Sequence, residues 1–109
     1  GKETGATIEI TTDPVVAVTG ANAVYADVWT SMGQEAEREE RLNLFAPYQV
    51  NEELMAHAKP EAVVLHCLPA HRGEEVSDAI MTKHNATIYE QAENRLHTQK
   101  ALLMLIIGL

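Results

Sequence analysis

The segment 62–68 (AVVLHCL) constrains the fold more than any other part of the sequence. It begins with four apolar residues in succession, which is typical of a strand buried on both faces of a parallel sheet. Parallel strands need crossover connections, which usually contain a helix. The rest of the chain should therefore alternate between strand-like and helix-like stretches.

This alternation is visible along the chain. Strand-like patterns predict further strands at residues 7–11, 23–28 and 87–90. Helical patterns predict helices at residues 15–19, 34–45, 52–58, 78–83 and 92–107. Strands separated by helices indicate βαβ units, so we expect an α/β fold with three layers and a four-stranded, mainly parallel sheet.

Several residues mark the expected helix ends. Asp13, Asn51 and Ser77 are typical N-caps, and Pro14 suits the first position of a helix. Gly20 suits the left-handed conformation that ends a helix. The charged segment 34–45 (QEAEREERLNLF) predicts a helix with a solvated face, in which Glu37 and Arg41 pair at i, i+4.

Composition excludes several classes of protein. Eight Lys and Arg against 16 Asp and Glu give a net charge of −8, which disfavours nucleic acid and anionic membranes as partners. The single cysteine, Cys67, excludes a scaffold built on internal disulfides. No N-terminal secretion pattern is visible, and the longest apolar run is shorter than the ~20 residues of a membrane span. We expect one cytoplasmic domain over residues 1–109, with no cofactor.

Polar residues gather where the predicted strands end, and this is the edge at which ligands bind in open α/β sheets. Asp27 follows the second strand, His66 and Cys67 end the third, and Arg95 follows the fourth. Such groups can hold a zwitterion or an oxyanion.

Each of these residues also has a simpler interpretation. Asp27 can cap the turn at 31–33, Cys67 can be an ordinary buried thiol, and Arg95 can be a surface arginine. His66, Cys67 and His71 suggest a metal site, but their spacing matches no structural zinc motif and a fourth ligand is not evident. Arg95 near the start of the last helix opposes the helix dipole, which points to an anionic partner.

Four motifs together resemble the ornithine carbamoyltransferases. They are 27–33 (DVWTSMG), 45–51 (FAPYQVN), 66–76 (HCLPAHRGEEV) and 93–95 (ENR). Related aspartate carbamoyltransferases have a His-Pro-Leu-Pro type of loop where this chain has HCLP, so the ornithine branch is favoured. Putrescine carbamoyltransferases share the cysteine loop, and the loop at 31–33 favours ornithine among them.

The resemblance implies a role for each matching residue. Asp27 would accept the α-ammonium group of ornithine, and Ser31 and Met32 would line the amino-acid pocket. Cys67, as the catalytic residue, and the backbone of Leu68 would lie beside the δ-amino group and the carbamoyl carbon. The remaining substrate-binding residue, which would hold carbamoyl phosphate, is Arg95. The family reaction gives citrulline and phosphate.

The resemblance also implies a truncated Rossmann-like or flavodoxin-like half domain. Family members are longer and have a separate carbamoyl-phosphate domain with a phosphate-binding loop, for which this sequence has no counterpart. Three interpretations stay open: a transferase fragment inactive alone, a self-associating structural, relic or engineered domain, or a subunit that complements a separate N-terminal half. Because the last helix keeps an apolar end and a strand edge is open, we expect a homo-oligomer, most simply a dimer with exchanged elements.

Overall fold

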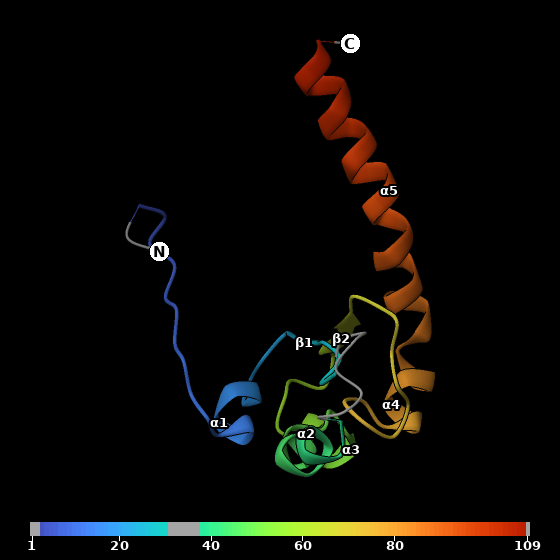
Figure 1. Cartoon of the computed structure of the whole chain (residues 1–109). Coiled ribbons are helices and arrows are strands. Elements are labelled where there is room, and N and C mark those ends of the chain that lie inside the picture. The colour runs from blue at the N-terminus through green and yellow to red at the C-terminus, as the bar shows by residue number, and fades with distance from the viewer. Residues whose placement is uncertain (1–2, 31–37, 109) are drawn as a thin grey trace.

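The computed structural model describes residues 3–30 and 38–108. Its elements, in chain order, are α1 (Pro14–Val18), β1 (Ala23–Ala26), α2 (Arg38–Phe45), the 3-10 helix η2 (Ala46–Tyr48), α3 (Glu52–Met55), β2 (Val63–His66), α4 (Asp78–Lys83) and α5 (Asn85–Ile107). Figure 1 shows that α5 extends from the body of the molecule as a long rod and that the N-terminal segment leaves it as an extended arm.

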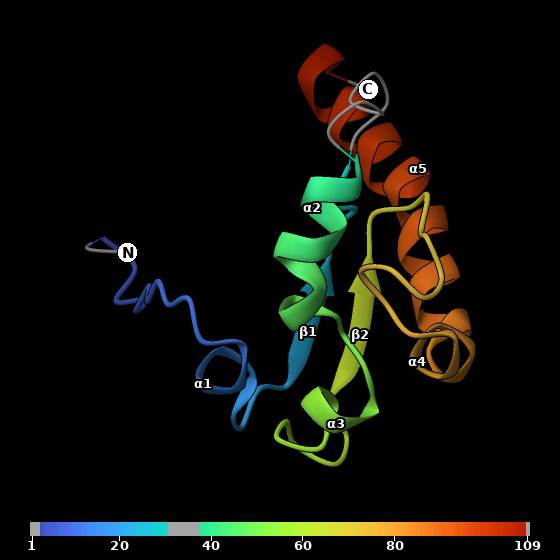
Figure 2. The same ribbon diagram turned by 60° about the horizontal axis from the view of Figure 1, so that its bottom comes forward.

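The two strands β1 and β2 lie side by side and parallel, with Ala23 opposite Val63 and Ala26 opposite His66. The chain crosses from the end of β1 to the start of β2 through α2, η2 and α3, as a parallel pair requires. Figure 2 shows the strands next to each other, with α5 on the β2 side of the sheet, where it packs against β2.

A small apolar core holds β2 against the helices that follow it. Val64 from β2 and Ile88 from α5 are fully buried, which fixes the first turns of α5 on the sheet. The other members of this core are Ala26, Val50, Val76, Ile80 and Met81. Since Ile88 is the buried residue of α5, the rest of that helix is largely exposed. No helix among the described residues is long and apolar enough to span a membrane.

The predicted caps are confirmed. Asp13 Oδ1 accepts hydrogen bonds from the backbone N–H groups of Val15 and Val16 at the start of α1. Asn51 caps α3 through its side chain, and Ser77 caps α4 in the same way. Gly20 follows α1 with a φ of 69°, the left-handed conformation expected there. Helix α3 is shorter than the predicted 52–58.

The expectation of a strand at residues 7–11 is wrong. The segment has no regular structure, and the side chains of Ile8 and Ile10 are 77% and 96% exposed. A strand is stable only when its backbone pairs with a neighbour, and no described strand lies beside this one. Residues 7–11 therefore have the alternating pattern of a strand, but no described strand lies beside them to pair with.

The expectation of a strand at residues 87–90 is also wrong. These residues belong to α5, which begins at Asn85 instead of residue 92. Helix formation is cooperative, so a helix can extend into a segment with β-branched and aromatic residues where packing favours it. Burial of Ile88 against the core supplies that packing. The described sheet consequently has two strands instead of four.

Helix α2 covers the second part of the predicted helix 34–45, and residues 34–37 lie outside the described part of the chain. The predicted pair of Glu37 with Arg41 therefore falls outside it too. The described helix has no buried residue, which agrees with a solvated face. Phe45 at its end contacts the rings of Trp29 and Tyr48, with centroids 6.2 Å away in each case.

Candidate functional site

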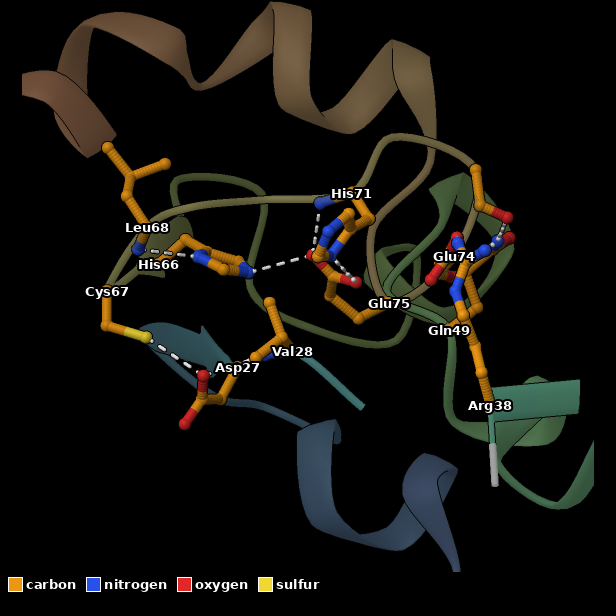
Figure 3. Close-up of polar contacts among 11 residues, drawn as sticks. Asp27, Val28, Arg38, Gln49, His66, Cys67, Leu68, His71, Glu74 and Glu75 are labelled. Atoms are coloured by element: carbon orange, nitrogen blue, oxygen red, sulfur yellow. Dashed lines mark hydrogen bonds and ion pairs between the residues drawn. The ribbon is translucent and has the colours of Figure 1, made fainter. Parts of the chain in front are cut away.

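The ends of β1 and β2 place an acid and a thiol next to each other. Because Ala26 lies opposite His66, the residues that follow them, Asp27 and Cys67, leave the sheet at the same edge. The Sγ of Cys67 donates a hydrogen bond to Oδ1 of Asp27 over 3.0 Å, as drawn in Figure 3. The predicted meeting of these side chains at the carboxyl edge of the sheet is thus present.

Asp27 is held as an anion by its hydrogen bonds. The Cys67 thiol and the backbone N–H of Val28 both donate to its carboxylate and lower the pKa of Asp27 below its ordinary value, with the thiol as the larger cause. The contacts that the structure describes for Asp27 are thus with residues at the strand ends, Cys67 and Val28. The turn at 31–33, which Asp27 could cap, lies outside the described residues. An exposed, ionised carboxylate suits an ammonium partner.

Cys67 is exposed at this edge, so its interpretation as a buried thiol is wrong. The hydrogen bond to Asp27 raises the pKa of the Cys67 thiol, and partial burial and the negative charge of Asp27 act in the same direction. A raised pKa keeps the sulfur protonated at neutral pH. Cys67 is therefore a hydrogen-bond donor here and a poor nucleophile.

A buried pair supports the loop that carries Cys67. The ring of His66 accepts a hydrogen bond at Nδ1 from the backbone N–H of Leu68, over 2.9 Å. This bond assigns the neutral ring proton to Nε2, which lies 3.1 Å from Oε1 of the buried Glu75 (Figure 3). Glu75 Oε1 also accepts a hydrogen bond from the backbone N–H of His71.

Sequence reasoning missed the contribution of Glu75. The available signal was weak: a carboxylate directly before apolar Val76 in a loop of polar residues. The His66–Glu75 pair matters because it fixes Leu68, whose φ of 54° is unusual for a residue with a side chain. A left-handed residue of this kind costs about 1–3 kcal/mol and persists where its surroundings hold it, often at functional sites. The bond between Leu68 and Pro69 is cis.

Arg95 reaches the same region from α5. It lines a hollow of about 370 Å³ together with Tyr25, His66, Cys67, Gln91 and Ala92. The expectation that Arg95 lies near the helix start is wrong, because α5 begins at Asn85 and the helix dipole acts mainly on the first turn. Arg95 is exposed and forms no ion pair with the part of the chain that the structure describes.

The structure thus brings together Asp27, Cys67, Leu68 and Arg95 around the carboxyl ends of the strands. The other predicted pocket residues, Ser31 and Met32, lie outside the described residues.

The suggested metal ligands His66, Cys67 and His71 do not form a site. Both ring nitrogens of His66 already have partners, and the Cys67 thiol donates to Asp27. Ligand atoms of a different group, His71, Glu74 and Glu75, lie within 4.8 Å of one another. Glu74 pairs with Arg38, and Oε1 of Glu75 contacts His66 Nε2 and the backbone N–H of His71. The other oxygen of Glu75, Oε2, lies 3.8 Å from His71 Nδ1 and has no hydrogen bond within the described residues. The arrangement is an Arg38–Glu74 ion pair next to a hydrogen-bonded His66–Glu75 pair, as drawn in Figure 3.

Comparison with known proteins identifies the family of the chain. Residues 1–106 match the family described as aspartate/ornithine carbamoyltransferase, Asp/Orn binding domain. The chain belongs to this family. Its predicted resemblance to the ornithine carbamoyltransferases is confirmed by relatives of that name, and the enzyme from Geobacillus stearothermophilus is 58% identical over 107 residues.

Solved structures give the same result. Ornithine carbamoyltransferase from Pyrococcus furiosus superposes with a TM-score of 0.90 at 55% identity, over 98% of this chain and 34% of that one. The Geobacillus stearothermophilus relative is likewise matched over 98% of this chain and 34% of its own length. An ornithine carbamoyltransferase from Thermococcus kodakarensis is 56% identical over 97% of this chain and 34% of its own. The chain thus spans about a third of the length of the relatives it matches.

Proposed function

We propose that this chain forms the ornithine side of a carbamoyltransferase site. The observation that carries the proposal is the juxtaposition of ionised Asp27, the protonated thiol of Cys67 and Arg95 at one edge of the sheet. The anion of Asp27 matches the α-ammonium group of an amino acid, and the neutral thiol of Cys67 matches its reacting amine. The cation of Arg95 matches a phosphate. The family match supports ornithine or a similar amino acid as substrate.

The reaction we propose is the transfer of a carbamoyl group from carbamoyl phosphate to L-ornithine. The uncharged δ-amine attacks the carbamoyl carbon, a C–N bond forms, the C–O bond to phosphate breaks, and the proton lost by the amine passes to the released phosphate. No atom changes its oxidation state and no covalent enzyme intermediate forms in this scheme, so we propose no cofactor. Catalysis of this kind depends on positioning and electrostatics.

Each residue has a part in this scheme. Asp27 accepts hydrogen bonds from the α-ammonium group, and Ser31 and Met32 line the pocket. Cys67 and the backbone of Leu68 lie beside the reacting amine and the carbamoyl carbon. Arg95 holds the phosphate of the second substrate, where a fixed cation stabilises developing negative charge.

We propose that these 109 residues act as one domain and are inactive alone. They cover about a third of the matched relatives, and a carbamoyl transfer needs both reactants held. Complementation by a separate carbamoyl-phosphate half and a purely structural role are the competing proposals.

A single unpaired cysteine fits a reducing compartment, so we propose a cytoplasmic location.

We also propose that the chain forms a homodimer with exchanged elements. The end of α5 carries exposed large apolar side chains on most of its surface; these are Leu102, Leu103, Met104, Leu105, Ile106 and Ile107. Full burial of one such side chain contributes about 1.5–3 kcal/mol. The exposed arm with Ile8 and Ile10 is a second apolar element without a partner in the described chain. A second copy covers both at once.

Ornithine binding tests the proposed function. Asp27 and the pocket supply few polar contacts, each contributing about 1 kcal/mol, so we expect a dissociation constant of about 1 mM or weaker. Titration of ornithine followed by NMR should shift resonances at the edge of the sheet. Asp27→Asn should abolish these shifts, whereas Glu61→Gln, which removes one exposed negative charge elsewhere, should leave them unchanged. Equal shifts in both variants contradict the proposal.

A further inference from the structure

The outer edge of β2 is covered by side chains in place of a third strand. The backbone N–H of Val63 faces the β1 side, where it donates to the carbonyl oxygen of Asn22. Because successive N–H groups of a strand alternate in direction, those of Val64 and His66 face the other side. His84 Nδ1 accepts from Val64 at 3.4 Å, and Gln91 Oε1 accepts from His66 at 3.0 Å. These side chains satisfy donors that an open edge leaves exposed.

Gln91 makes a second contact that His84 lacks. Its Nε2 donates to the hydroxyl of Tyr25 on β1, over 2.7 Å. One half-buried amide therefore joins β1, β2 and α5, and both of its polar atoms are engaged. In Figure 2, α5 lies along the β2 side of the sheet and then continues past it.

The position of Gln91 along the chain connects the two parts of the site. Its partner His66 directly precedes Cys67, whose thiol donates to Asp27. Gln91 also lies one helical turn before Arg95, on the same face of α5, and both line the hollow beside Cys67. A shift of α5 along the sheet therefore changes the distance between Arg95 and Cys67 unless Gln91 prevents it.

We propose that Gln91 is a positioning residue, which holds the end of β2 and the Arg95 turn of α5 in register so that Cys67 faces Asp27 and Arg95 faces the same hollow. The roles of Cys67 and Arg95 in this statement rest on the proposed function. The link itself rests on the two hydrogen bonds of the amide, to the backbone of His66 and to the hydroxyl of Tyr25. It is distinct from the cap at His84, which lies at the far end of β2.

The test uses the 109-residue protein and the alkylation of Cys67 by iodoacetamide as a function of pH. Gln91→Leu keeps the size of the side chain and removes both hydrogen bonds. We expect the end of β2 to relax, the Cys67–Asp27 bond to weaken and the pH midpoint of alkylation to fall. The alkylation rate at mildly alkaline pH should rise about twofold or more, because more thiolate is present.

Two variants separate positioning from loss of stability. Gln91→Glu keeps an oxygen acceptor for the N–H of His66 and can accept from the Tyr25 hydroxyl, so the midpoint should not fall. Gln99→Leu makes the same change two turns further along α5, where Gln99 has no described hydrogen bond, and should leave the profile of the parent unchanged. Circular dichroism checks that each variant is folded.

A double substitution separates the two roles further. In an Asp27→Asn background the Cys67–Asp27 charge interaction is already lost, so Gln91→Leu should cause no additional fall in the midpoint. A residue that merely stabilises the fold would change Cys67 access equally in both backgrounds, and that result overturns the proposal. A folded Gln91→Leu protein with the midpoint of the parent also overturns it.

If Gln91→Leu does not fold, the alkylation profile of Tyr25→Phe tests the positioning role instead. It removes one of the two bonds at an exposed ring, and we expect a smaller fall in the same direction; no fall overturns the proposal. The outcome is independent of substrate. Ornithine titration fails if the proposed function is wrong, whereas the alkylation profile fails if the positioning role is wrong.

Discussion

The thiol of Cys67 donates a hydrogen bond to the carboxylate of Asp27 at 3.0 Å, although 40 residues separate them in the chain. The two residues meet because β1 and β2 are parallel and in register, so that both strands end at one edge of the sheet. The contact has opposite effects on its partners. It lowers the pKa of Asp27 and raises that of Cys67, which favours an anion beside a protonated sulfur.

The first prediction concerns this pair. Asp27→Asn removes the negative charge and the strong acceptor that disfavour the thiolate, so the pKa of Cys67 should fall toward its ordinary value. Alkylation at neutral pH should become faster by about threefold or more, since the thiolate is the reactive species. Mass spectrometry after timed labelling measures the rate. Glu61→Gln serves as the control, and an unchanged rate in Asp27→Asn contradicts the prediction.

The second prediction concerns His84. Burial, and to a smaller degree the charge of Lys83, lower the pKa of His84 below its ordinary value. The unfolded chain therefore binds a proton at a higher pH than the folded chain does. The free energy of unfolding should be greatest above the ordinary histidine pKa of about 6.5 and should decrease as the pH falls from there through the lower pKa of the folded state.

Urea unfolding at several pH values measures this decrease. His84→Asn keeps an acceptor near the position of Nδ1 for the N–H of Val64 but cannot titrate, so its stability should change less over the same range. His57→Asn, at an exposed histidine outside α5, should keep the pH dependence of the parent. Identical pH dependence in the parent and in His84→Asn contradicts the prediction.

The third prediction concerns the anchor of α5. Ile88 is fully buried and is the residue through which that helix packs into the core. Ile88→Ala should lower the free energy of unfolding by about 2–5 kcal/mol, because it removes apolar contacts and leaves a cavity. Leu96→Ala, at an exposed position of the same helix, should change it by less than about 0.5 kcal/mol. Denaturant unfolding decides, and equal effects of the two changes refute the assignment.

Much of this fold could be predicted from the sequence, but the conformation of two segments could not. The apolar run in β2, the N-caps Asp13, Asn51 and Ser77 and the left-handed Gly20 were all predictable, because each reflects a local preference. Segments 7–11 and 87–90 have the local pattern of strands as well. Their conformation depends on whether a neighbouring strand or a helix is available, which no local pattern contains.

The candidate site shows the same division. Asp27 and Cys67 were predictable from their positions after strands, together with the resemblance to a family. Arg95 was indicated by the resemblance alone, because the strand expected before it is part of α5. The simpler interpretation of Cys67 failed because exposure depends on how the loop after β2 turns. Gln91 was not predictable, since it acts through the backbone N–H of His66, which lies 25 residues away in the chain. Glu75 was not predictable either, because its contacts with His66 and His71 depend on how the loop after β2 folds back on itself.

The fourth prediction is that the 109-residue chain alone forms no citrulline from carbamoyl phosphate and ornithine. Positioning of both reactants lowers a barrier by about 7–11 kcal/mol, and the chain spans about a third of the relatives that it matches. A colorimetric citrulline assay on protein produced without host carbamoyltransferase measures this. Cys67→Ala protein prepared in parallel reports contamination. Citrulline formed by the parent but not by that variant contradicts the prediction.

The last prediction is that the chain self-associates through the end of α5. Leu103 and Ile106 are exposed there, in a stretch where nearly every neighbour is apolar as well, and their burial in a second copy contributes about 1.5–3 kcal/mol for each side chain. Light scattering at micromolar concentration should report a mass well above the 12.0 kDa of one chain. The double change Leu103→Glu and Ile106→Glu should shift the protein toward the monomer by at least about tenfold in dissociation constant. Thr98→Glu together with Gln99→Glu adds the same charge at polar positions of the same helix and should leave the mass unchanged. A folded monomer of the parent at that concentration refutes self-association, and equal weakening by both double changes shows that charge, and not this apolar surface, controls it.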